Sequence, residues 1–176
     1  MKTRLIYLLT FIIITACGNK ELDNNLAQSE LSNQQGWETK KTAKYSISYP
    51  IDWSFSEDNV GTEFIVTSPL ATKPNDMFAE NVNLMVQLVG NMSMKSYMEL
   101  TNQQLSAMNV SEFNSRDVKD HKELEYLFDY LGNKVKVLQY LWIVNGKAYI
   151  LTFTDLKSAY TTHIKQAIQI LDSFKF

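Results

Sequence analysis

The sequence has 176 residues and a formal net charge of −2, and 45% of its residues are hydrophobic. A chain of this size favours one domain with a substantial core, and its mild acidity excludes the basic surface expected of a nucleic-acid-binding protein. Cys17 is the only cysteine, which excludes an intrachain disulfide and a cysteine-based zinc site.

The N-terminal segment has the pattern of an exported lipoprotein. Lys2 and Arg4 precede the apolar stretch of residues 5–14, which is shorter than the roughly 20 residues needed to cross a bilayer. Ile14-Thr15-Ala16-Cys17 then resembles the lipobox, in which small residues precede a cysteine that accepts diacylglycerol as a thioether. We therefore expect residues 1–16 to be a cleaved signal peptide and Cys17 to carry the lipid. The alternative is a core cysteine that follows an apolar helix.

Residues 17–36 are predicted to be a flexible tether. Asn, Gln, Ser and Glu dominate this segment, and its few leucines are too sparse to build a core. A coil of about 19 residues has a root-mean-square reach of about 24 Å, enough to lift a domain clear of the lipid headgroups. Removal of residues 1–16 takes Lys2 and Arg4 away and changes the formal net charge from −2 to −4. The acylated Cys17, rather than a basic patch, is therefore expected to hold the protein at the bilayer.

The residues after Cys17 also bear on localisation. Gly18 occupies the position at which an aspartate would signal retention in the inner membrane, so the enterobacterial sorting rule favours the outer membrane. Lys20-Glu21 and Asp23 loosely resemble the acidic signal for export to the cell surface, which leaves the periplasmic and the surface face both open.

From Trp37 onward the apolar residues alternate with polar ones, as in half-buried strands. Strands are predicted over residues 45–50, 64–67, 83–89, 110–115, 123–130, 134–144 and 147–154, with Trp53 and Phe55 in a further extended segment. The last three predicted strands form a meander with turns at residues 131–133 and at Asn145-Gly146. Asn-Gly between two apolar runs is a strong hairpin signal.

Two helices are predicted in the remaining segments. Ser93 is a typical N-cap, and apolar residues recur at helical spacing from Met94 to Met108. The second helix is predicted over residues 156–172, capped by Asp155 or Thr154. Its expected apolar stripe consists of Tyr160, Ile164, Ala167, Ile168 and Leu171.

The longest predicted strand is apolar on both faces, with Val137 and Leu141 on one face and Leu138 and Trp142 on the other. A central strand that is buried on both sides requires cover on both faces of its sheet. The sequence therefore predicts an α+β fold for residues 37–176, an antiparallel β-sheet with helices on both faces in an α/β/α sandwich.

Five segments, taken in order, resemble the PsbP-like domains. They are Trp37 with residues 45–50 and Trp53, residues 64–70, residues 78–84, residues 149–154, and the pair Ser173-Phe174. The stretch Phe78-Ala-Glu-Asn-Val-Asn-Leu84 is similar to the most recognisable motif of that family. The resemblance implies the α/β/α sandwich shared by PsbP and the DcrB envelope proteins, and the lipobox makes the chain resemble PsbP-related bacterial lipoproteins. Because this fold carries several binding roles, the resemblance does not imply one function.

Candidates for chemistry are few in the sequence. Its six glycines include no Gly-x-Gly, and it has no Gly-x-Ser-x-Gly elbow. His121 and His163 are interpreted as solvated surface histidines. Glu80, Asn81 and Asn83, with Asp76 upstream, could supply oxygen ligands to calcium, but we interpret them as structural residues at the beginning of a strand. Met92, Met94 and Met98 could suggest copper(I), but helix packing explains them better.

These observations predict a non-catalytic, membrane-tethered binding or accessory lipoprotein of the bacterial cell envelope. We expect no catalytic residue, no cofactor and no nucleic-acid partner. The expected partners are the lipid bilayer, through acylated Cys17, and an envelope protein. The alternative is an envelope lipoprotein that binds a small molecule or a metal such as calcium, with a catalytic role left open. A deep pocket that gathers carboxylates would favour this alternative, and a shallow apolar surface would favour the first reading.

Overall fold

The computed structural model describes residues 36–57, 59–69 and 78–176. The predicted signal peptide, Cys17, nearly all of the predicted tether, and Asp76 lie outside the described residues, so the expectations about them remain predictions. The described elements follow the chain in this order: β1 (Trp37–Lys41), β2 (Ser46–Pro50), β3 (Ser54–Ser56), β4 (Phe64–Thr67), β5 (Asn81–Leu88), α1 (Met94–Ala107), β6 (Ser111–Val118), β7 (His121–Tyr130), β8 (Asn133–Val144), β9 (Lys147–Leu156) and α2 (Tyr160–Asp172).

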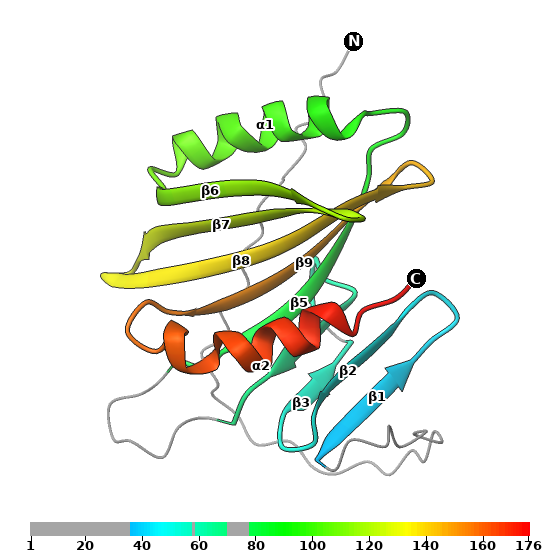
Figure 1. The fold of residues 1–176 in the computed structure, drawn as a ribbon, viewed down its shortest axis with the longest axis vertical. Coiled ribbons are helices and arrows are strands. Elements are labelled where there is room, and N and C mark those ends of the chain that lie inside the picture. Colours follow the sequence, from blue (N-terminus) through cyan, green and yellow to red (C-terminus); the bar gives the residue numbers. More distant parts are fainter. Residues whose placement is uncertain (1–35, 58, 70–77) are drawn as a thin grey trace.

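The main sheet has seven antiparallel strands in the order β3-β4-β5-β9-β8-β7-β6, so the α+β class is confirmed (Figure 1). Strands β7, β8 and β9 form the predicted meander. At its second turn, Asn145 and Gly146 have φ values of 51° and 72°, the left-handed conformations that a tight hairpin turn requires. Strand β5 pairs with β9, which brings the segment after residue 80 beside the C-terminal strand. Strands β1 and β2 form a separate hairpin.

The two helices begin for different reasons. In α1, the Ser93 hydroxyl oxygen accepts a hydrogen bond from the Ser96 backbone N–H at 3.1 Å, so the predicted N-cap is confirmed. The predicted start of α2 is wrong. Strand β9 continues to Leu156, and α2 begins at Tyr160 after Ala159, with no side-chain cap. Asp155 is a buried strand residue rather than a helix cap.

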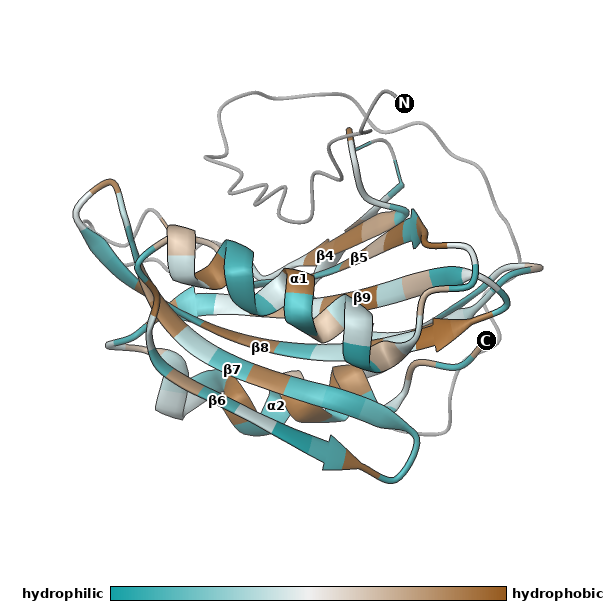
Figure 2. Ribbon diagram, turned by 90° about the horizontal axis from the view of Figure 1, so that it is seen from above, coloured by the Kyte–Doolittle hydropathy of each residue, from teal (hydrophilic) through white to brown (hydrophobic). Residues whose placement is uncertain are grey.

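Buried side chains of the central strands fall into separate clusters. Leu84, Leu151 and Phe153 pack in a cluster that includes Ala167 and Ile170 of α2. Their strand neighbours Met85 and Ile150 pack instead with Tyr97 and Met98 of α1. Figure 2 shows hydrophobic residues concentrated along β4, β5 and β8. Alternate residues of a strand point to opposite faces, so this division follows from the strand period.

The stripe of α2 differs from the prediction at more than one position. Tyr160, Ala167 and Leu171 are buried as predicted, and Ile164 is partly buried. Ile168 is exposed, and Ile170, which was not predicted, is buried in its place. Among the described residues, no helix has the length and apolar character needed to cross a membrane.

Candidate functional site

The three residues of the predicted calcium motif lie where the chain enters β5, and all three are buried. They are held by different partners. The Asn83 side-chain N–H donates to Asn81 Oδ1 at 3.2 Å, and the Asn81 side-chain N–H donates to the Ala79 carbonyl at 3.4 Å. Glu80 contacts Ser68 and His163 instead. The motif therefore divides into an asparagine pair and a separate carboxylate.

The asparagine pair belongs to a buried polar row that crosses the sheet. Asn81 lies opposite Thr154 of β9, and Asn83 lies opposite Thr152. The Gln139 side-chain N–H of β8 donates to Thr152 Oγ1 at 3.1 Å, and all of these side chains are buried. Buried polar groups stabilise a fold only when they are hydrogen-bonded, so the row depends on each member keeping its partner.

Replacing Asn81 with alanine should therefore lower stability while it changes no ligand affinity directly. The change leaves Asn83 without its acceptor in a buried row, which should cost about 1–3 kcal/mol. Denaturant melts of Asn81→Ala measure this cost. Asn102→Ala, an exposed position on α1, serves as the matched control and should change stability by less than about 0.5 kcal/mol. An Asn81→Ala protein of unchanged stability that has lost calcium binding in calorimetry would contradict the structural reading.

Glu80, Asp155 and His163 form a compact cluster of three potential metal ligands. His163 Nδ1 lies 2.9 Å from Asp155 Oδ2 and 3.4 Å from Glu80 Oε1. The other oxygen of Glu80, Oε2, accepts a short hydrogen bond from the Ser68 hydroxyl. Asp155 is fully buried and Glu80 nearly so, while the His163 side chain is 33% exposed. The cluster is thus a buried pair of carboxylates with one imidazole on its solvent side.

The fold brings these residues together by strand register and helix packing. Asn81 pairs with Thr154, so the antiparallel register carries Glu80 towards Asp155. Asp155 follows Phe153 at the strand period and shares its side of the sheet, where α2 packs. His163 is one turn beyond the buried Tyr160 and one turn before the buried Ala167, which places it at the margin of the packed stripe.

The electrostatics of the cluster are unfavourable to two ionised carboxylates. The pKa of Asp155 is raised from 3.8 to about 6. Burial is the main cause, because it penalises the charged form; the hydrogen bond with His163 opposes this shift, and the charge of Glu80 adds to it. Asp155 Oδ1 is buried and has no hydrogen-bond partner within the described parts of the chain.

The interpretation of both histidines as solvated surface residues is wrong. The His121 side chain is only 9% exposed, and its ring stacks on Tyr140 with centroids 4.1 Å apart. His121 Nε2 also lies 3.6 Å from Glu123 Oε1. His163 joins the carboxylate cluster. Two spacings in the sequence could have indicated the cluster. Asp155 is two residues after Phe153, as on one side of a strand, and His163 is three residues after Tyr160, as on one side of a helix. Both signals depend on knowing where the strand ends and the helix begins.

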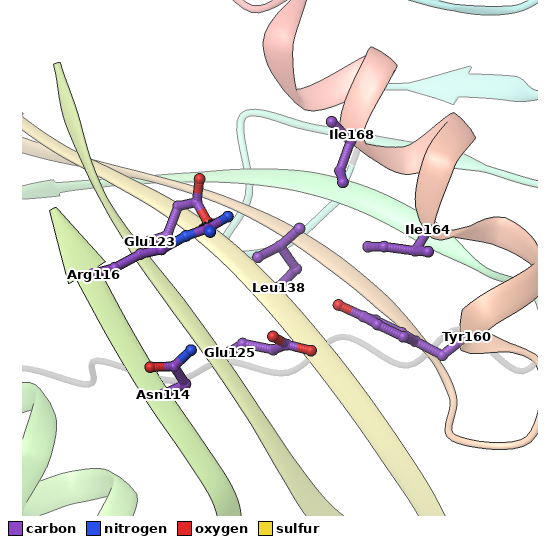
Figure 3. A pocket seen from close by; sticks show the side chains of 8 residues that line it. All are labelled: Asn114, Arg116, Glu123, Glu125, Leu138, Tyr160, Ile164 and Ile168. Atoms are coloured by element: carbon purple, nitrogen blue, oxygen red, sulfur yellow. Dashed lines mark hydrogen bonds and ion pairs between the residues drawn. The ribbon is translucent and has the colours of Figure 1, made fainter. Parts of the chain in front are cut away.

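A small pocket lies between the outer strands of the sheet and α2 (Figure 3). Its volume is about 160 Å³, and Arg116 on its wall is paired with Glu123. Tyr160 is hydrogen-bonded to Glu125, and burial followed by the charge of this carboxylate raises the pKa of Tyr160. Glu125 also lies 3.3 Å from Lys136 Nζ, so each charged group that lines the pocket already has a partner. Its volume is below the roughly 300 Å³ at which small-molecule sites begin.

A wider hollow of about 420 Å³ lies beside α1. It is lined by Met94, Lys95, Met98, Glu99 and Asn102 of α1, and by Asp117 and Lys122 of the β6 and β7 strands. The three methionines considered as copper ligands all pack with the cluster under this helix, Met98 as a buried member and Met92 and Met94 against its edge. The hollow thus combines apolar side chains with charges of both signs.

Comparisons with known proteins identify the fold. No protein-family model matches the sequence, and no curated protein matches it. The solution structure of cyanobacterial PsbP (CyanoP) from Synechocystis sp. PCC 6803 is similar with a TM-score of 0.60 at 13% identity, covering 85% of this chain and 98% of that chain. The crystal structure of LpqN from Mycobacterium tuberculosis is similar with a TM-score of 0.53 at 14% identity, covering 74% of this chain and 82% of that one.

A protein of unknown function from Pseudomonas aeruginosa is also similar, with a TM-score of 0.50 at 16% identity over 77% of this chain and 95% of the other. At such identities the similarity concerns the fold and leaves the function open. The resemblance of the ordered sequence segments to PsbP-like domains is confirmed at the level of the fold: the chain has a PsbP-like fold.

Proposed function

We propose that the protein is a membrane-tethered accessory lipoprotein of the bacterial cell envelope, whose PsbP-like domain binds a protein partner without catalysing a reaction. The observation that carries this proposal is the combination of the lipobox at Ile14 to Cys17 with a polar segment before the folded domain. A lipid on Cys17 and a tether of residues 17–36 would hold the domain close to a bilayer while leaving it free to reach a neighbour. We favour the outer membrane over the inner as its location.

The similar structures support an envelope role. LpqN is described as involved in cell envelope biogenesis, and CyanoP is a cyanobacterial PsbP. In this proposal the two helices cover opposite faces of the sheet, which is supported by the division of neighbouring strand residues between clusters with α1 and clusters with α2. One face of α1 would then be free to contact a partner.

The hollow beside α1 supports binding of a protein rather than catalysis on a small substrate. Met94 and Met98 offer flexible apolar contacts, and Lys95 and Glu99 lie exposed at its rim. Protein interfaces commonly have such an apolar centre with a polar rim. The pocket beside α2, in contrast, is too small for most ligands and its charges are already paired.

The proposal is tested by capturing the lipidated protein, cross-linked in its own envelope, and identifying its partners by mass spectrometry. We expect a reproducible envelope protein whose recovery falls severalfold with Lys95→Glu, because this change reverses a charge at the rim of the hollow. Lys165→Glu is the matched control, since Lys165 is exposed on α2. Equal recovery of the partner with both variants would show that the contact surface does not include Lys95 of α1. Absence of any partner would contradict the accessory role.

A further inference from the structure

We propose that Glu80, Asp155 and His163 bind a divalent transition metal of the zinc class. Each residue offers one ligand atom, and the three atoms lie within 4.8 Å of one another. The ligands come from the segment before β5, from the end of β9 and from the first turns of α2. Packing of the sheet and helix therefore holds them together before any ion arrives. This differs from the sequence-based expectation of no metal, and from the calcium alternative that grouped Glu80 with the asparagines.

The two distances from His163 to the carboxylates are close to those of tetrahedral coordination. Zinc binds imidazole nitrogen and carboxylate oxygen at about 2.0–2.2 Å, which separates neighbouring ligand atoms by about 3.3–3.5 Å. His163 Nδ1 lies 3.4 Å from Glu80 Oε1 and 2.9 Å from Asp155 Oδ2. An ion would replace the proton that Nδ1 and Asp155 share in their hydrogen bond, with a slight widening of that contact.

The unmatched oxygen of Asp155 is independent evidence for a ligand. Asp155 is 0% exposed, and its Oδ1 has no hydrogen-bond partner among the residues described. A buried carboxylate is retained in proteins when it is paired with a cation or coordinates a metal. His163 is the cationic candidate nearest to both carboxylates, and one imidazolium cannot neutralise two of them. A divalent ion would balance both charges.

Ser68 supplies the outer support that metal ligands commonly have. Its hydroxyl donates to Glu80 Oε2, which leaves Oε1 directed towards His163. Hydrogen bonds of this kind orient a ligating carboxylate, and their loss typically weakens metal binding by about 10–100-fold. Ser68 is itself 9% exposed, so the contact is shielded from water.

The ligand types favour zinc over calcium. Calcium takes six to eight oxygen ligands, whereas this cluster offers two carboxylates and a nitrogen. Imidazole with carboxylate suits zinc and neighbouring first-row metals. The His163 side chain is 33% exposed, and a water molecule would supply the fourth ligand.

The test uses the full lipidated chain in detergent, purified with a tag that contains no histidine and freed of metal by a chelator. Calorimetric titration with Zn²⁺ should show one site per chain, and Co²⁺ should give the visible absorption of a tetrahedral complex. His163→Gln and Glu80→Gln should each weaken Zn²⁺ binding at least tenfold. Ser68→Ala should weaken it by about 10–100-fold while it keeps all three ligands.

His121→Gln is the matched control, because it makes the same substitution at the other histidine of the chain. It should leave Zn²⁺ affinity unchanged, and thermal melts of every variant verify folding. Absence of Zn²⁺ binding by the unmodified chain would overturn the proposal, as would equal affinity of His163→Gln or tighter binding of Ca²⁺ than of Zn²⁺. Metal binding and partner capture are measured separately, so either can fail while the other holds.

Discussion

Replacing Cys17 with alanine should release the protein from the membrane into the soluble fraction. The thiol of Cys17 is the atom that would carry the diacylglycerol, and removal of residues 1–16 would leave a formal net charge of −4, which does not favour binding to an anionic lipid surface. Incorporation of labelled palmitate should be abolished, and fractionation should show the change from membrane-bound to soluble protein. The melting temperature of the domain should stay the same, because residues 17–36 are too polar to contribute to its core.

Ser32→Ala is a suitable control for this experiment, since it changes a residue of the predicted tether without touching the lipobox. It should leave both labelling and membrane retention intact. If the Cys17→Ala protein stayed membrane-associated to the same extent, the lipoprotein reading would be refuted.

The second large effect is expected at Asp155, whose replacement by asparagine should stabilise the metal-free protein near neutral pH. The pKa of Asp155 is raised from 3.8 to about 6, chiefly by burial. Below pH 4 the carboxyl is protonated in both the folded and the unfolded chain. Between about pH 4 and pH 6 this carboxyl is ionised in the unfolded chain but still protonated in the folded chain, so the free energy of unfolding falls as the pH rises over this range and levels off above about pH 6.

The magnitude follows from the size of the shift. The rise in the pKa of Asp155 from 3.8 to about 6 lowers the free energy of unfolding by at most about 3 kcal/mol at pH 7 and above. The free energy of unfolding of Asp155→Asn minus that of the unmodified chain should therefore grow by up to this amount between pH 4 and pH 7. Denaturant melts in chelator at several pH values measure the difference. Glu80 and His163 are the titratable groups that face Asp155, and both remain in the two proteins compared.

Asp129→Asn provides the comparison for an exposed carboxylate, since Asp129 lies at the surface of β7 and pairs with Lys134. Its effect on stability should be small, because exposed ion pairs contribute little. A difference between Asp155→Asn and the unmodified chain that stayed constant from pH 4 to pH 7 would show that Asp155 titrates normally.

Much of the fold could be predicted because its signals are local. Strand β4 was predicted with its observed bounds, Phe64–Thr67, because three apolar residues and a β-branched threonine are followed directly by Ser68-Pro69. The Asn145-Gly146 turn and the Ser93 cap depend on two to four neighbouring residues, whose conformations are decided by their own backbone preferences. The β1 strand was not predicted, because its sequence WETKK is largely polar and it is stabilised by pairing with β2.

By itself, the sequence determined the lipoprotein hypothesis, the order of the strands and helices after β1, and the resemblance to a PsbP-like fold, since each depends on composition, period or short motifs. Only the tertiary structure decided which polar residues meet. The sequence indicated Asp155 as a possible helix cap and His163 as a solvated residue. Their true surroundings depend on the continuation of β9 two residues past its predicted end and on the register of β5 against β9. Glu80, Asp155 and His163 are far apart along the chain, and no local pattern encodes their contact. Strand pairing and the packing of α2 on the sheet create it, and burial of the joined carboxylates then produces the raised pKa of Asp155.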